Sequence, residues 1–270
     1  MKNSTLLALV SAASLLAGGA SAAPFINGSF EDGTSDGWTR GAGSRVNVLN
    51  NAINVPDFLP GGSRFSTANG GVNRSAVVPA GTVDPRVGAA LGSTVYSGNY
   101  SFRIEDTNTG GYASVLSQSV LNYTDASIFF AYKAVLEEAH SANDSALFRL
   151  LLRDDTTGTN IVTRDFNSNT TGGGVDPRFT QTASGYFYTP DWQIEQVNID
   201  ASLSGHNFTL SVFAADCEPS GHLGYVYLDG FGAAPPTSGG DTGVSVPEPA
   251  SLSLLGLGMA GMLLARRLKA

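Results

Sequence analysis

Alternation of apolar and polar side chains in short segments is the feature that most restricts how this chain can fold. Residues 100–105, 208–212 and 226–229 carry apolar side chains at every second position, separated by more polar ones. Successive side chains on a β-strand point to opposite faces, so this period places the apolar side chains on one face. We therefore predict a half-buried strand in each segment.

Further strand candidates are rich in β-branched and aromatic residues and are separated by clusters of Gly, Asn and Asp. They are residues 25–30, 45–49, 112–121, 127–135, 146–153, 160–166, 186–188 and 193–199. No segment of the mature chain has the period of a long amphipathic helix. Many short strands with turn residues between them predict an all-β, antiparallel fold, either a sandwich or a barrel.

The N-terminus predicts export. Met1-Lys2 is a short basic region, residues 6–16 are apolar, and Ala20-Ser21-Ala22 is a small-residue cleavage signal. This order is typical of a secretory signal peptide. We predict a signal peptide over residues 1–22, with Ala20 and Ala22 directing cleavage and the mature chain beginning near Ala23.

The C-terminus predicts a second targeting segment. Residues 250–265 form an apolar run. The run lies between a short motif and a basic pair, Val246-Pro247-Glu248-Pro249 and Arg266-Arg267. Apolar side chains partition into the bilayer while arginines stay on the cytoplasmic side, so we predict a transmembrane helix over this run. At about 1.5 Å per residue it spans roughly 24 Å, short for a permanent anchor in a core of about 30 Å.

This tail, residues 246–270, resembles the PEP-CTERM sorting signal of Gram-negative bacteria. The resemblance implies recognition by an exosortase-type membrane protease and removal of the tail. It further implies export through the inner membrane, transient anchoring there, and delivery to the cell surface or extracellular matrix. The alternative is an ordinary C-terminal anchor that follows a Pro-rich linker.

Residues 23–232 remain as one domain, long enough to bury its own core. Residues 233–245 are small, Pro, Gly and hydroxyl residues and predict a solvated linker. The net charge of −8 and the lack of clustered Lys and Arg exclude nucleic acid as a partner. Cys217 is the only cysteine, so the core or a bound ion, and not an internal disulfide, must hold the domain together.

Both ends of the domain resemble galactose-binding-like jelly rolls, the fold of many carbohydrate-binding modules. The matching residues are Asn27-Gly28-Ser29-Phe30-Glu31 with Gly37-Trp38, and Gly224 to Asp229. The resemblance implies an antiparallel jelly-roll β-sandwich with a structural calcium ion where the first and last strands meet. It assigns the side chains of Glu31 and Asp229 and the carbonyl of Ser29 as ligands, and calcium prefers such oxygen ligands. The alternative is a surface glutamate at a turn and an aspartate that caps a strand.

Residues 216–225 resemble a Cys-x-x-Gly-Gly-His-x-Gly-Tyr signature of secreted bacterial β-sandwich domains, with Ser220 in place of the first glycine. One interpretation is a zinc site made by Cys217 and His222, completed by Asp216 or His206. The other is a hairpin with a buried cysteine and a histidine bonded to backbone. We favour the hairpin, because no tight spacing brings four ligands together.

Catalysis has little support in the sequence. Residues 137–138 and 154–155 are adjacent carboxylates, which point to opposite faces of a strand. The serines form no nucleophile elbow, and the three histidines give no triad order. We predict a non-enzyme; a glycoside hydrolase is the less favoured alternative.

Aromatic side chains offer a route to sugar binding, because the apolar face of a pyranose stacks on an aromatic ring. Tyr112, Tyr186 and Tyr188 are the candidate ligand-binding residues. We predict a secreted protein that binds exopolysaccharide. The alternative is a purely structural matrix or surface protein with no carbohydrate ligand.

Overall fold

A computed structural model describes residues 25–138, 140–171 and 176–237. The predicted signal peptide and the predicted sorting tail, with its helix over 250–265, lie outside these residues. Within the described part, no helix is both long enough and apolar enough to cross a membrane.

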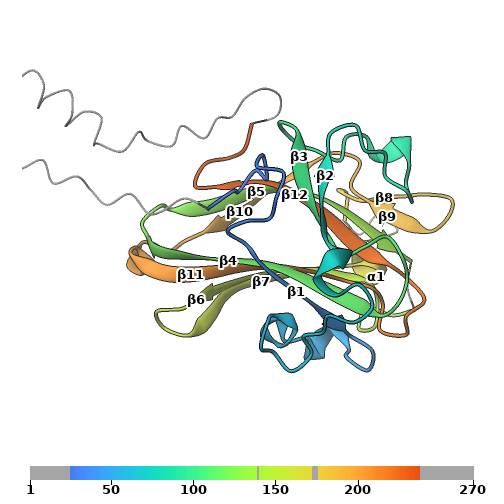
Figure 1. The fold of residues 1–270 in the computed structure, drawn as a ribbon, viewed down its shortest axis with the longest axis horizontal. Coiled ribbons are helices and arrows are strands. Elements are labelled where there is room, and N and C mark those ends of the chain that lie inside the picture. Colours follow the sequence, from blue (N-terminus) through green and yellow to red (C-terminus); the bar gives the residue numbers. More distant parts are fainter. Residues whose placement is uncertain (1–24, 139, 172–175, 238–270) are drawn as a thin grey trace, which may run out of the picture.

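Two antiparallel sheets pack face to face as a jelly-roll β-sandwich, which confirms the predicted fold class (Figure 1). One sheet has five strands. Their order is β1 (Thr39–Ser44), β4 (Tyr112–Tyr123), β11 (His206–Ala215), β6 (Leu147–Asp154) and β7 (Thr159–Asn167).

The other sheet has seven strands. Its order is β2 (Ala76–Pro79), β3 (Tyr100–Ile104), β12 (Gly224–Gly232), β5 (Ser127–Glu137), β9 (Tyr186–Tyr188) and β8 (Thr180–Gln181), with β10 (Gln193–Asn198) also paired to β5. Two strands pair with the same edge of β5. Strand β10 pairs with residues 127–132, and β9 pairs with residues 135–137.

Helices are short and lie in the connections. The described residues contain one α-helix, α1 (Ser168–Thr171), and the rest are 3-10 turns. These are η1 (Asn50–Ala52), η2 (Val55–Phe58), η3 (Gly71–Arg74), η4 (Ala89–Leu91) and η5 (Ala201–Leu203).

The main core lies between the sheets and follows the period of two read from the sequence. Phe208, Leu210 and Val212 of β11 point inward, as do Val226 and Leu228 of β12. All five side chains are fully buried. The predicted alternation therefore places the inner face of both strands correctly.

The outer faces are also largely covered, so the expectation of half-buried strands is wrong for β12 and for much of β11. Tyr225 and Tyr227 of β12 pack outside the sandwich with Leu91 of η4. Phe213 of β11 packs on the opposite outer face with Phe58 of η2. The long connections before β2 and β3 lie over the two sheets and bury these side chains.

Two predicted strands are not formed. Residues 26–29 make a turn, because Asn27 and Phe30 have φ of 49° and 58°, in the left-handed region that no strand adopts. Residues 45–49 form a connection that wraps around the buried Arg45 side chain. The guanidinium of Arg45 donates to the carbonyl oxygens of Ser145 and Asp216 at 3.1 and 2.7 Å.

The sequence analysis missed β1, β2 and β8. Strand β1 carries few apolar side chains because the connection that follows it packs directly on its backbone. A Cβ atom on Gly41 or Gly43 would lie 2.4 or 2.0 Å from the carbonyl oxygens of Phe58 and Arg64, respectively. Only glycine allows that approach.

Candidate functional site

A pocket of about 220 Å³ opens beside β1 and the start of β4. Its lining includes a tyrosine ring, two guanidinium groups and several amide and hydroxyl groups. These come from Ser44, Ser63, Arg64, Asn69, Arg74 and Tyr112.

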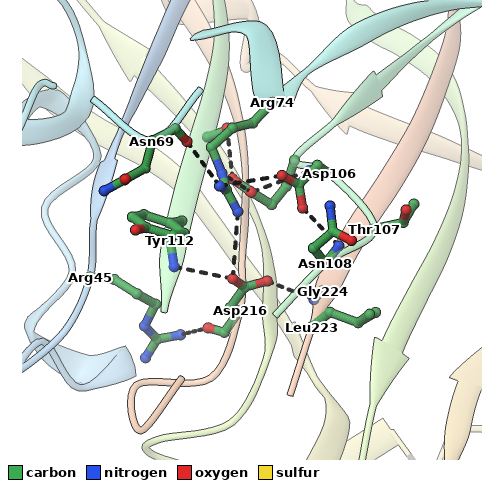
Figure 2. A network of polar contacts seen from close by, with 12 residues as sticks. Arg45, Asn69, Arg74, Asp106, Thr107, Asn108, Tyr112, Asp216, Leu223 and Gly224 are labelled. Carbon is green, nitrogen blue, oxygen red and sulfur yellow. Dashed lines mark hydrogen bonds and ion pairs between the residues drawn. The ribbon is translucent and has the colours of Figure 1, made fainter. Parts of the chain in front are cut away.

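Arg74 lines the pocket. Its side chain also connects several segments (Figure 2). It ends η3 and is buried, and its guanidinium bonds to the Glu105 carboxylate. It also lies 3.3 Å from Asp106 Oδ2 and 3.8 Å from Asp216 Oδ2. The guanidinium carbon sits 4.0 Å from the centre of the Tyr112 ring, so it holds that ring by a cation–π contact.

Two of these carboxylates, Glu105 and Asp216, are fully buried. Burial raises the pKa of Glu105, against the opposing charge of Arg74. Burial, together with the charge of Glu105, raises the pKa of Asp216 to about 8. Two buried carboxyls thus share one guanidinium, and burial favours the protonated form of each.

The network positions Tyr112 in a second way. The backbone N–H of Tyr112 donates to Asp216 Oδ2 at 3.1 Å, which ties the start of β4 to the turn before β12 (Figure 2). The ring is therefore held in place by its backbone and by Arg74. Gly110 packs against one side of the ring, because a Cβ atom on Gly110 would lie 2.4 Å from Tyr112 Cε2.

The three tyrosines predicted to bind ligand are not brought together. Tyr112 lines this pocket, whereas Tyr186 and Tyr188 lie on β9 of the other sheet. Tyr188 is only 8% exposed and packs with Val135 and Tyr225, and Tyr186 is partly buried against the same cluster. Burial therefore removes Tyr188 from the set of accessible rings. The alternation of side chains along β9 could not predict this burial, because a separate connection lies over the outer face of the sheet and covers Tyr188.

Glu31, the first predicted calcium ligand, lies over the loop that precedes β3. Its carboxylate accepts the backbone N–H groups of Asn99 at 2.9 Å and Tyr100 at 3.0 Å. Gly98 has φ of 73°, which favours glycine, and a Cβ atom there would lie 2.4 Å from Glu31 Cδ and displace the carboxylate. Ser29, the predicted carbonyl ligand, lies in the turn 26–29 just before Glu31.

Asp229, the second predicted ligand, binds the same loop from inside the sheet. Its Oδ2 accepts the backbone N–H groups of Tyr96 and Ser97, each at 3.1 Å. Its Oδ1 is buried, and no group among the described residues bonds to it. Burial raises the pKa of Asp229 to about 7, and the charge of Glu31 adds to the rise.

The opening segment also contacts the closing strand directly, since the Phe231 N–H donates to the Gly28 carbonyl at 2.9 Å. Glu31 and Asp229 therefore meet at one loop, where the two ends of the domain lie together. A cation with oxygen ligands would bind the buried, unbonded Oδ1 of Asp229. It would also offset the repulsion between the Glu31 and Asp229 carboxylates.

Asp216 and His206, the two residues considered from the sequence as further zinc ligands, contact other groups. His206 Nδ1 lies 2.9 Å from Asp154 Oδ2, and Asp216 belongs to the Arg74 network. The turn itself is formed, with the Cys217 N–H bonded to the His222 carbonyl at 2.8 Å. However, the buried His222 Nδ1 has no partner within the part of the chain that the structure describes, so the expected bond to backbone is not made there. Sequence reasoning missed His140, which the fold places beside this turn.

Residues 245–268 match the family described as the PEP-CTERM protein-sorting motif. The match confirms the motif predicted from the tail. No curated protein matches the chain.

Three similar solved structures are carbohydrate-binding modules. TmCBM61, solved with beta-1,4-galactotriose, is 12% identical, with 78% of this chain and 97% of that chain covered and a TM-score of 0.40. The non-crystalline cellulose-specific module CBM28 is 14% identical, with 76% of this chain and 92% of that chain covered and a TM-score of 0.36. The CBM22-1 xylan-binding domain of Paenibacillus barcinonensis Xyn10C is 16% identical, with 78% of this chain and 94% of that chain covered and a TM-score of 0.31.

Proposed function

We propose that this is an exported, non-catalytic surface or matrix protein that binds an exopolysaccharide at the Tyr112 pocket. The observation that carries the proposal is the ring of Tyr112, held by Arg74 at the wall of a pocket with amide, hydroxyl and guanidinium groups. A sugar presents a flat apolar face and a rim of hydroxyls, which such a combination recognises.

The size and charge of the pocket narrow the ligand class. Its volume of about 220 Å³ is below the roughly 300–1,000 Å³ of sites that enclose a whole small molecule. It therefore suits one sugar unit of a longer chain. Arg64 donates to the Ser44 carbonyl at 3.4 Å and, among residues 25–138, 140–171 and 176–237, pairs with no carboxylate. This unpaired cation favours an acidic sugar such as a uronate.

The glycan proposal predicts a difference between two tyrosines. Tyr112→Leu should weaken binding to a uronate-containing polysaccharide by about tenfold, roughly 1.4 kcal/mol, because a stacked ring contact is lost. Tyr186→Leu, the matched control on the other sheet, should bind as the parent does. Glycan-array screening followed by calorimetry makes the measurement. Failure to bind any polysaccharide on the array would instead favour a structural protein without a carbohydrate ligand.

For the tail, we propose that an exosortase-type protease cleaves it after export. Glu248→Ala should leave the signal peptide functional but trap the uncleaved chain in the membrane, because the processing motif is lost while the apolar run remains. Immunoblots of membrane and extracellular fractions report this, with Asp241→Asn in the linker as control. Normal-sized Glu248→Ala protein outside the cell would contradict the proposal.

At the junction of the two chain ends, we propose a structural calcium ion held by Glu31, Asp229 and the Ser29 carbonyl. A cation bound only by the folded state stabilises it by about 2.7 kcal/mol at a hundredfold excess over Kd. Calcium should therefore raise the melting temperature of the purified protein, and a chelator should lower it. Glu31→Gln and Asp229→Asn should each remove most of this increment, whereas Asp32→Asn, an exposed neighbour, should retain it.

Magnesium should substitute poorly, because it requires a smaller octahedral site. Thermal unfolding with calcium, with magnesium and with chelator decides the question. Superimposable calcium and chelator curves at neutral pH would reject the site and leave the glycan proposal untouched.

A further inference from the structure

A cysteine and two histidines from separate segments meet at one end of the seven-stranded sheet. Cys217 and His222 belong to the turn before β12, and His140 follows the end of β5. The Cys217 Sγ and one ring nitrogen of each histidine all lie within 4.8 Å of one another. From this cluster we infer that His140, Cys217 and His222 bind a zinc ion.

The donor set has the chemistry of a zinc site. Zinc binds thiolate sulfur at about 2.3 Å and imidazole nitrogen at about 2.0–2.1 Å, in tetrahedral geometry. Ligand atoms around such an ion lie about 3.3–3.6 Å apart, so the separations in this cluster must contract by at most roughly 1.5 Å. The exposed His140 can supply it by rotating its side chain toward the buried sulfur.

The turn already orients the sulfur. The His222 N–H donates to Cys217 Sγ at 3.1 Å. Hydrogen bonds of this kind hold a metal ligand in place and stabilise its charged form. On binding, zinc would form a bond to sulfur, and the thiol proton would leave to solvent.

His222 supplies an independent indication. Its Nδ1 is buried and has no hydrogen-bond partner among the described residues. The ring of His222 lies beside that of His140, with centroids 4.7 Å apart. A buried ring nitrogen without a partner is unfavourable, and an ion bound by Nδ1 itself would remove that cost.

A pocket of about 300 Å³, lined by both histidines, Glu137 and Glu138, lies beside the cluster. Glu137 Oε2 already accepts the Leu223 N–H at 3.0 Å. Water or the Glu138 carboxylate can therefore complete the tetrahedron. With Glu138, the thiolate and one carboxylate would together offset the two positive charges of the ion.

The test is zinc titration of the purified, chelator-treated protein by calorimetry. We expect one zinc ion per chain, and His140→Ala should weaken binding by about 100-fold or more. Because His140 is exposed, its replacement should leave unfolding in the presence of chelator unchanged. His206→Ala removes the histidine paired with Asp154, outside the cluster, and should bind zinc as the parent does.

Cobalt(II) supplies a direct readout of the sulfur ligand. The cobalt-loaded protein should show a thiolate-to-cobalt charge-transfer band, and Cys217→Ser should lose it. Since Cys217 is fully buried and its replacement can impair folding, the band in the parent protein is the deciding observation. A cobalt complex without that band, or unchanged zinc affinity in His140→Ala, would overturn the inference.

Discussion

Arg74→Met should lower the free energy of unfolding by about 3–5 kcal/mol at neutral pH, because it removes one partner of a buried ion pair. Glu105 and Asp216 are both fully buried, and both would lose the guanidinium that offsets their charge. The same change removes the cation that holds the Tyr112 ring. We therefore expect loss of glycan binding together with loss of stability.

This loss should depend on pH. Carboxyls of an unfolded chain ionise near pH 4, whereas burial raises the pKa of Asp216 to about 8 and that of Glu105 in the same direction. Between these values the folded state binds more protons than the unfolded state, so stability falls as pH rises. Without Arg74 both pKa values should rise further, so the difference between variant and parent should grow as the pH rises through about 8, where Asp216 of the parent ionises.

Urea unfolding of Arg74→Met and the parent at pH 5, pH 7 and pH 9 measures both effects. Arg64→Met is the matched control, because Arg64 lines the same pocket but belongs to no ion pair in the part of the chain described. Its unfolding free energy should stay within about 0.5 kcal/mol of the parent. A destabilisation of Arg74→Met that is equally small, or that shrinks at higher pH, would contradict the assigned role.

Asp84→Ala should lower the unfolding free energy by about 2–6 kcal/mol, since it leaves two buried hydroxyls without an acceptor at about 1–3 kcal/mol each. Asp84 is only 2% exposed. Its carboxylate accepts the hydroxyl groups of Tyr225 and Tyr227, each at 2.8 Å to Oδ2. It also accepts the backbone N–H of Val87 at 2.7 Å, which fixes the connection over the outer face.

A compensating variant separates hydrogen bonding from packing. Tyr225→Phe with Tyr227→Phe, added to Asp84→Ala, should recover a large part of the loss, because removing both partners leaves no unsatisfied hydroxyl. Burial, with the charge of Asp84 in addition, raises the pKa of both tyrosines, so the hydroxyls are protonated donors at neutral pH. Urea unfolding at pH 7 gives the comparison. If the triple variant is no more stable than Asp84→Ala, the hydroxyls are not the origin of the effect.

The sequence located most strands because strand periodicity is a local property. Strand β9 was predicted with its observed bounds, and β4, β5 and β6 to within two residues at each end. The failures also have local causes. Left-handed backbone at Asn27 and Phe30 breaks an apolar segment that reads as a strand, and glycine-rich β1 lacks the side chains that would reveal it.

Some of the site residues could likewise be identified from the sequence, and others could not. Tyr112 could be named because an aromatic residue opens a strand, and Glu31 and Asp229 because motifs at both domain ends resemble a known fold. Arg74 could not be identified from the sequence, because its buried position depends on residues that are distant along the chain.

The sequence by itself determined the all-β class, the inner face of the main strands and the sorting motif, because each depends on residues within one short segment. Tertiary structure alone decided which side chains meet. It placed Arg74 against Asp216, 142 positions away, and His140 beside His222. It also covered the outer faces of both sheets, which buried Tyr188 and left Tyr112 at a pocket. Such contacts follow from strand order and from the path of long connections, and neither is encoded in the local alternation of side chains.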